Sequence, residues 1–178
     1  MKPTVLVVLL IISIVFFGNI TNLSAEFLEA GVQKLETPID APDFSLKMLG
    51  RDEVSLKELK GRVILINFSH PYCSVCEKQI LSLNKLDEEI KNKDLVILFV
   101  SIEGKEKDLF EFKNRLNISS PILIDDNGIV SRAYQVRGHH ESFFIDRQGK
   151  IVGKTFSVED WTSKNMKRLI EFLLLERK

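Results

Sequence analysis

The sequence predicts an α/β domain with a central mixed sheet flanked by helices. Residues 63–68 and 95–100 form nearly continuous apolar runs, a pattern typical of strands that are buried on both faces of a parallel sheet. Between these runs, apolar residues recur at helical spacing over residues 80–90. Strand, helix and strand together predict a βαβ unit with a right-handed crossover.

Alternation and turn residues predict the elements around this unit. Residues 44–46 and 53–56 alternate on either side of a glycine-containing turn, which predicts an N-terminal β-hairpin extension followed by one helical turn. A second hairpin is predicted around the turn at 146–149. The remaining predicted elements are a helix over 109–116, a strand over 121–124, a short helix over 129–134 and a closing helix over 169–174.

Composition limits the classes of protein to which the chain can belong. The chain has 178 residues, which suits one domain with a short extension, and 44% of them are apolar, which is enough for a core. Lysine and arginine together number 25, as do aspartate and glutamate, and no basic block stands out. The charge pattern therefore predicts no nucleic-acid partner.

The first 25 residues differ in composition from the rest of the chain. Lys2 is followed by a long apolar run, and no acidic residue precedes Glu26. This arrangement is typical of a secretory signal peptide, here with a cleavage site at Ala25. If the leader is not cleaved, residues 3–20 are long enough to anchor the chain in a membrane. The sequence thus predicts an exported protein, periplasmic or otherwise extracytoplasmic, with a leader (1–25), a linker (26–37) and one domain (38–178).

The only two cysteines, Cys73 and Cys76, lie three positions apart. They follow a predicted buried strand and precede a predicted helix, so Cys73 is expected at the helix N-terminus, where unpaired N–H groups and the helix dipole favour a thiolate. The spacing places Cys76 one turn further on the same face, within reach for a disulfide bond. The pattern predicts a redox-active pair in which Cys73 attacks and Cys76 resolves.

Seven stretches carry a family resemblance: Ala41–Phe44, Leu59–Val63, Ile66–Phe68, Cys73–Cys76, Val100–Glu103, Tyr134–Gly138 and Phe143–Gly149. Taken together they resemble the TlpA/ResA-type thiol–disulfide oxidoreductases, the redoxin branch of the thioredoxin-like superfamily. The resemblance implies a thioredoxin-like fold and exchange with the thiols and disulfides of protein partners. It also implies an upstream membrane reductant and, often, a role in cytochrome c maturation.

Three places near the pair depart from that family's pattern. His70-Pro71-Tyr72 stands where the family has an aromatic-rich run, and Gln79, which cannot titrate, stands where it has a glutamate. His140 occupies the position of a cis-proline that shapes the groove for a substrate's disulfide. Because a cis bond before a non-proline residue costs about 2.5–4 kcal/mol, a trans bond is expected there. The resemblance implies a groove lined or tuned by His70, Pro71, Tyr72, Gln79, His139 and His140.

The three histidines, His70, His139 and His140, are expected on loops beside the cysteine pair. Our first hypothesis is that they tune the charge of the thiolates, with no metal and no cofactor. The alternative is a copper-binding protein similar to the SCO-type copper chaperones, which would hold the metal through Cys73, Cys76 and His140 or His139, because two thiolates and imidazole suit copper.

Overall fold

The computed structural model describes residues 23–176, apart from residues 93, 139 and 159. It confirms the predicted βαβ unit, which consists of strand β4 (Val63–Ser69), helix α2 (Ser74–Ile90) and strand β5 (Leu95–Ser101). The two strands pair in parallel along their whole length, and every residue of β4 is buried. The continuous apolar run therefore reflects a strand that has neighbours on both sides and cover on both faces.

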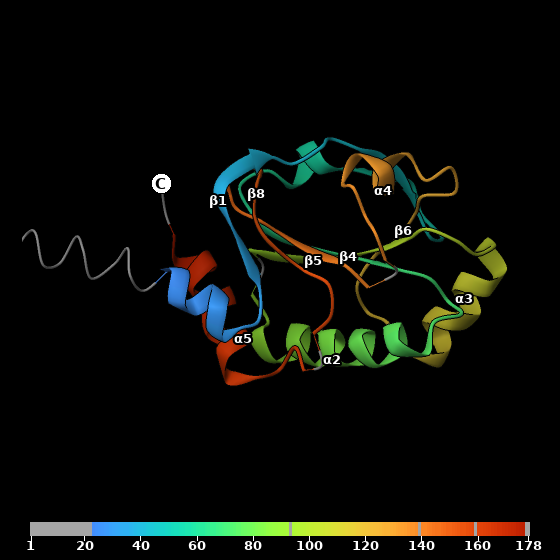
Figure 1. Cartoon of the computed structure of the whole chain (residues 1–178). Coiled ribbons are helices and arrows are strands. Elements are labelled where there is room, and N and C mark those ends of the chain that lie inside the picture. Colours follow the sequence, from blue (N-terminus) through green and yellow to red (C-terminus); the bar gives the residue numbers. More distant parts are fainter. Residues whose placement is uncertain (1–22, 93, 139, 159, 177–178) are drawn as a thin grey trace, which may run out of the picture.

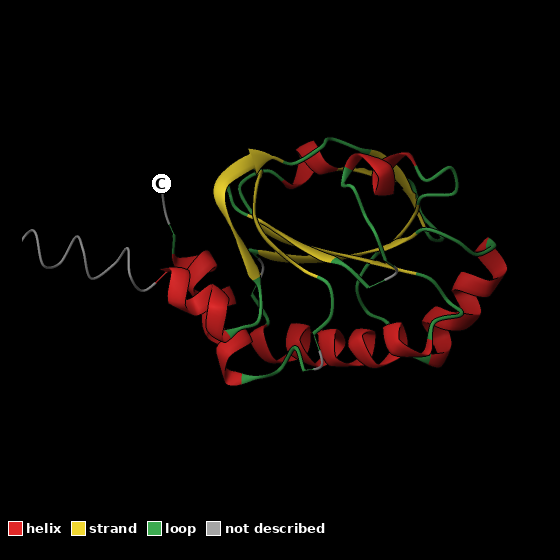
Figure 2. Ribbon diagram, in the orientation of Figure 1, coloured by secondary structure: helices red, strands yellow, loops and turns green. Residues whose placement is uncertain are grey.

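These strands lie in the middle of a mixed sheet whose order, over the described residues, is β1-β8-β7-β4-β5-β6-β2-β3. Strand β6 (Ile122–Ile124) is parallel to β5, whereas β7 (Ser142–Ile145) and β8 (Lys150–Thr155) continue the sheet antiparallel on the other side of β4. Figure 1 shows the twisted sheet with α2 running along one face, and Figure 2 shows the same arrangement by element type. The predicted fold class is confirmed.

Helices cover both faces of the sheet and form two hydrophobic clusters. Helices α2, α3 (Glu106–Arg115) and α5 (Lys164–Leu175) contribute to the larger cluster, which includes the fully buried Trp161. The short helices η1 (Leu56–Leu59) and α4 (Ile129–Ala133) contribute to the cluster on the opposite face. Removing these apolar side chains from water supplies the main favourable term in folding.

The predicted N-terminal hairpin is formed by strands β2 (Ser45–Met48) and β3 (Glu53–Ser55), which pair antiparallel. Gly50 in its turn has a φ of 72°, a left-handed conformation that favours glycine. Strand β2 also pairs with β6, so the hairpin extends the sheet beyond the parallel strands. The single helical turn expected after the hairpin is η1, whose start is stabilised by a capping box between Ser55 and Glu58.

The expected linker over residues 26–37 is corrected by the structure. Residues 23–29 are helical, and strand β1 (Gln33–Asp40) pairs antiparallel with β8 at the edge of the sheet. Phe27 and Val32 are buried in the larger hydrophobic cluster. The stretch shows no alternation in its sequence because most residues of this edge strand are exposed, so only its pairing with β8 reveals it as a strand.

Most of the predicted leader lies outside the described residues, and so does the proposed membrane anchor over residues 3–20. Within the part of the chain that the structure describes, no helix is long and apolar enough to cross a membrane. Export and cleavage at Ala25 therefore stay predictions.

Candidate active site at the start of helix α2

The N-terminus of helix α2 holds the two cysteines, as the sequence predicts. Cys73 is the N-cap residue, and its sulfur accepts a hydrogen bond from the backbone N–H of Cys76 at 3.1 Å. A disulfide bond joins Cys73 to Cys76, whose Cα atoms lie 5.2 Å apart. When the bond is open, the same N–H groups at the start of the helix stabilise a negative charge on the Cys73 sulfur.

The two cysteines differ sharply in exposure. Cys76 is 1% exposed and faces the core, whereas Cys73 is only half-buried. Tyr72 and Val75, which flank Cys73, are 65% and 50% exposed. A partner protein can therefore reach Cys73, while Cys76 is almost completely covered.

The loop before Cys73 is held by contacts with the neighbouring β5–α3 loop. The Nδ1 atom of His70 accepts a hydrogen bond from the backbone N–H of Tyr72 at 3.2 Å. Pro71 is buried against Gly104, where a side-chain Cβ would lie 2.9 Å from the proline ring and where φ is 110°. Gly104 therefore allows the two loops to approach closely.

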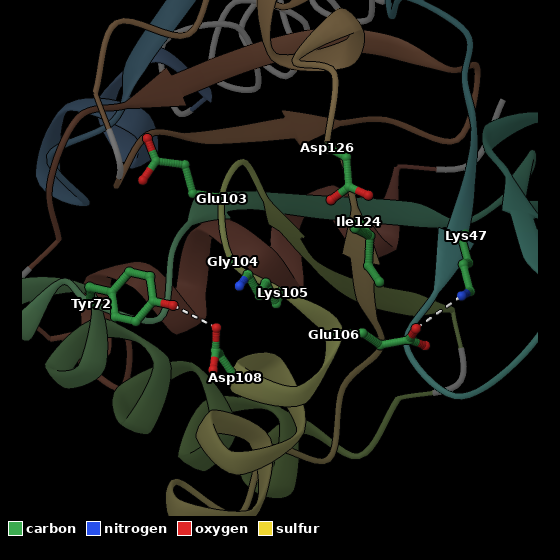
Figure 3. A pocket seen from close by; sticks show the side chains of 9 residues that line it. All are labelled: Lys47, Tyr72, Glu103, Gly104, Lys105, Glu106, Asp108, Ile124 and Asp126. Atoms are coloured by element: carbon green, nitrogen blue, oxygen red, sulfur yellow. Dashed lines mark hydrogen bonds and ion pairs between the residues drawn. The ribbon is translucent and has the colours of Figure 1, made fainter.

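A recess of about 640 Å³ adjoins Cys73 through Tyr72 (Figure 3). The hydroxyl of Tyr72 donates a 2.7 Å hydrogen bond to Asp108, and this bond, with a smaller contribution from burial, raises the pKa of Tyr72. Lys47 and Glu106 form a 3.1 Å ion pair on the opposite wall. The lining carries four carboxylates and two amines, so the surface beside the cysteine pair is polar with an excess of negative charge: Glu103, Glu106, Asp108, Asp126, Lys47 and Lys105.

The loop before strand β7 brings His140 to the cysteines. One imidazole nitrogen of His140 and the two sulfurs all lie within 4.8 Å of one another. The loop is fixed at Glu141, whose carboxylate accepts the N–H of Arg137 at 3.0 Å and whose carbonyl accepts the N–H of Phe68 at 2.9 Å. His139 and the peptide bond between the two histidines lie outside the described residues, so the expected trans bond stays a prediction.

Gln79 lies one turn after Cys76 on the buried side of α2 and is 3% exposed. Its amide nitrogen donates a 3.2 Å hydrogen bond to the hydroxyl of Ser157, on the segment that follows β8. Its carbonyl oxygen has no hydrogen-bond partner among the described residues. Gln79 thus presents a neutral amide beside the pair, where it cannot accept a proton.

The structure brings together, at one end of α2, all the described residues that the sequence singled out: His70, Pro71, Tyr72, Cys73, Cys76, Gln79 and His140. Sequence reasoning missed Gly104, Asp108 and Glu141. Glu141 lies just before the hairpin predicted around 146–149, and Asp108 immediately precedes the helix predicted over 109–116, so neither pattern distinguished them from solvated residues. Gly104 lies three residues after the last residue of β5, and its place in the loop at the end of that strand was the one available signal.

The central mixed sheet, the flanking helices and a vicinal cysteine pair at the start of α2 define a thioredoxin-fold thiol–disulfide oxidoreductase. The model of the AhpC/TSA family matches residues 39–154, more than half of the chain. The chain therefore belongs to the AhpC/TSA family.

Curated relatives have similar lengths and related names. The thioredoxin-like protein YneN of Bacillus subtilis is 32% identical over 145 residues, which cover 80% of this chain and 82% of YneN. The thiol-disulfide oxidoreductase ResA of Bacillus cereus is 28% identical over 154 residues, which cover 86% of this chain and 89% of ResA. The resemblance to the ResA-type proteins predicted from sequence motifs is thereby confirmed.

Solved structures show the same fold. The thioredoxin domain of a thiol-disulfide oxidoreductase from Bacteroides vulgatus is 26% identical with a TM-score of 0.67, over 78% of this chain and 97% of that one. A thiol:disulfide interchange protein from Chlorobium tepidum is 18% identical with a TM-score of 0.69, over 79% of this chain and 99% of that one. The second likeness supports the fold alone.

Proposed function

We propose that this oxidoreductase exchanges disulfides with protein partners outside the cytoplasm, with Cys73 as the attacking thiolate and Cys76 as the resolving thiol. The observation that carries these roles is the difference in exposure between the two sulfurs. Cys73 is accessible and lies at the positive end of a helix, whereas Cys76 is buried behind it. A mixed disulfide with a partner can thus form at Cys73 and be resolved from within.

The proposed exchange conserves electrons and protons. The Cys73 thiolate attacks one sulfur of the partner's disulfide, and the partner's other sulfur leaves and takes up a proton. Cys76 then loses its proton and attacks the Cys73 sulfur, so that the intramolecular disulfide forms and the second partner sulfur leaves. The partner gains two electrons and the pair loses two. Since the chain has only these two cysteines, an external reductant must reset them.

The proposal also specifies the compartment and the pathway in which the protein acts. The apolar leader supports export, and it supports attachment to the membrane if it is retained. The resemblance to ResA-type proteins supports an upstream membrane reductant and partners in cytochrome c maturation.

The copper alternative remains second. In the reduced state the two thiolates and His140 form a donor set whose chemistry suits copper. In the disulfide form, however, the two sulfurs are bonded to each other, and the relatives reported above carry the names of redox proteins. We therefore assign no metal to these residues. Copper(I) binding is measured in the experiment that follows, because it distinguishes the two functions.

Reduction of insulin by the full-length protein tests the proposal. We expect turnover with dithiothreitol as the reductant, and loss of that turnover in Cys73→Ser. Lys78→Ser, which places serine on the exposed side of the same helix, should keep it. Fractionation of the producing cells should find the protein outside the cytoplasm or in the membrane. No turnover, together with tight one-to-one copper(I) binding, would favour the alternative.

A further inference from the structure

Cys76 must lose a proton during the proposed exchange, and its surroundings make that step difficult. The residue is 1% exposed, so bulk water cannot take the proton directly. Burial favours a neutral thiol over a charged thiolate. Cys73 avoids this difficulty because it lies at the helix N-terminus and is half-buried. The resolving step therefore needs a proton acceptor close to Cys76.

Among the described residues, His140 is placed to accept that proton. One of its ring nitrogens lies within 4.8 Å of both sulfurs, and no carboxylate belongs to this cluster. Its Nδ1 atom is buried and has no hydrogen-bond partner in the described part of the chain. A buried polar atom without a partner is costly and calls for an explanation, and a catalytic role is one that such atoms can have.

The other titratable groups at this end of the domain have partners elsewhere or lie outside the cluster that His140 forms with the two sulfurs. Glu77 forms a 2.8 Å ion pair with Arg115, and the Tyr72 hydroxyl donates to Asp108. Glu141 accepts the N–H of Arg137 through Oε2. Its Oε1 is buried without a partner in the described part of the chain, but Glu141 does not belong to the cluster that His140 forms with the two sulfurs. His70 accepts the backbone N–H of Tyr72 through Nδ1. Gln79 is the buried polar residue one turn beyond Cys76, and an amide cannot take up a proton.

We propose that His140 is the proton acceptor for Cys76 in the resolving step, an inference that rests on the proposed function. The neutral imidazole takes the Cys76 proton, directly or through one water, as the Cys76 sulfur attacks Cys73. The Cys73–Cys76 bond forms and the bond from Cys73 to the partner breaks. The imidazolium then gives its proton to the departing partner thiolate, so that His140 ends the cycle neutral.

Rapid mixing separates this step from the first one. The reduced full-length protein is mixed with glutathione disulfide, and the reaction is quenched in acid. The products are alkylated, and mass spectrometry quantifies the mixed disulfide. His140→Gln should slow resolution by about 10²-fold, within the usual range for general acid–base catalysis, so that the mixed disulfide accumulates. Formation of the mixed disulfide at Cys73 should change far less. A fold defect would instead slow both steps and lower the melting temperature.

A carboxylate introduced at position 79 of α2 should rescue the slow resolution of the His140→Gln variant. Residue 79 lies at i+3 from Cys76, and Gln79→Glu in the His140→Gln background should recover most of the resolution rate because it supplies a different proton acceptor on the same side. Gln79→Asn in the same background supplies no carboxylate and should not recover the resolution rate. His140→Asn is a second variant, in case the glutamine packs badly.

The pH profile supplies the remaining test. The resolution rate should depend on pH differently in the wild type and in His140→Gln, because only the wild type has an imidazole that can take the Cys76 proton. In His140→Gln, hydroxide and buffer must take that proton, so the rate should rise steadily with pH. Unchanged resolution and an unchanged profile in His140→Gln would overturn the inference and leave the proposed function intact. A wild type that forms no mixed disulfide would instead contradict the proposed function.

Discussion

Helix α2 and the N-terminal segment 23–40 both pack against the sheet, yet they leave very different groups accessible. At the start of α2, Cys73 is half-buried, and the nearby His140 has a ring nitrogen with no hydrogen-bond partner among the described residues. In segment 23–40, Phe27 is buried and Glu26 forms an ion pair with Arg168 of α5. The first region brings reactive groups together, and the second completes the core. Substitutions in the two regions should therefore separate activity from stability.

The largest loss of stability is expected for Phe27→Ala. Its side chain is 1% exposed and belongs to the larger hydrophobic cluster, so truncation should lower the free energy of unfolding by about 3–5 kcal/mol. Denaturant unfolding of the reduced protein measures this loss. Alkylation of Cys73 in the folded variant should keep its wild-type rate. A large change in that rate would show that the two regions are coupled.

A smaller loss is expected for Gly153→Ala in strand β8. An added Cβ would clash with the ring of Phe27 and lie 3.0 Å from Val32, and overpacking of this kind typically costs about 1–3 kcal/mol. Gly138→Ala is the matched control, because a Cβ there meets nothing within 4 Å. Combining Gly153→Ala with Phe27→Leu should cost less than the sum of the two changes. Additive losses would mean that β8 and segment 23–40 do not pack as described.

The smallest effect concerns the ion pair on the first turn of α2. The hydrogen bond and charge of Arg115 lower the pKa of Glu77, which offsets a smaller opposing contribution from burial. Because the pKa of this carboxyl is lowered in the folded protein, the ion pair stabilises the folded state at pH values above the ordinary carboxyl pKa of about 4.3. This stabilisation is lost as the pH falls through the lowered pKa. Melting temperatures of the wild type and Glu77→Gln should thus differ slightly at neutral pH and converge in acid. A constant difference across the pH range would contradict the assignment.

The contrast between the two regions also explains how much of the fold could be predicted. Strands β4 and β5 were predicted because their continuous apolar runs reflect burial on both faces. Strand β1 was missed because it is an exposed edge strand whose only structural signal is its pairing with β8, more than a hundred residues away. Local periodicity reports local burial, and it carries no information on such long-range pairing.

The candidate site was predictable to the extent that its chemistry is local. Cys73 and Cys76 form a short motif whose position between strand and helix could be read directly from the sequence. The approach of His140 to that motif depends on β7 pairing with β4, and the Asp108–Tyr72 hydrogen bond depends on how α3 packs. Sequence reasoning anticipated His140 from a family resemblance, whereas Asp108 and Glu141 required the structure.

Trapping of the intermediate tests the central claim most directly. Full-length Cys76→Ser and Cys73→Ser, each in reduced form, are incubated with insulin whose disulfide bonds are intact. The products are resolved on non-reducing gels and identified by mass spectrometry. If Cys73 attacks and Cys76 resolves, Cys76→Ser accumulates a mixed disulfide through Cys73, whereas Cys73→Ser, with its one thiol buried, traps almost none. Equal trapping by the two variants, or trapping through Cys76 alone, would contradict the assignment of roles on which the account depends.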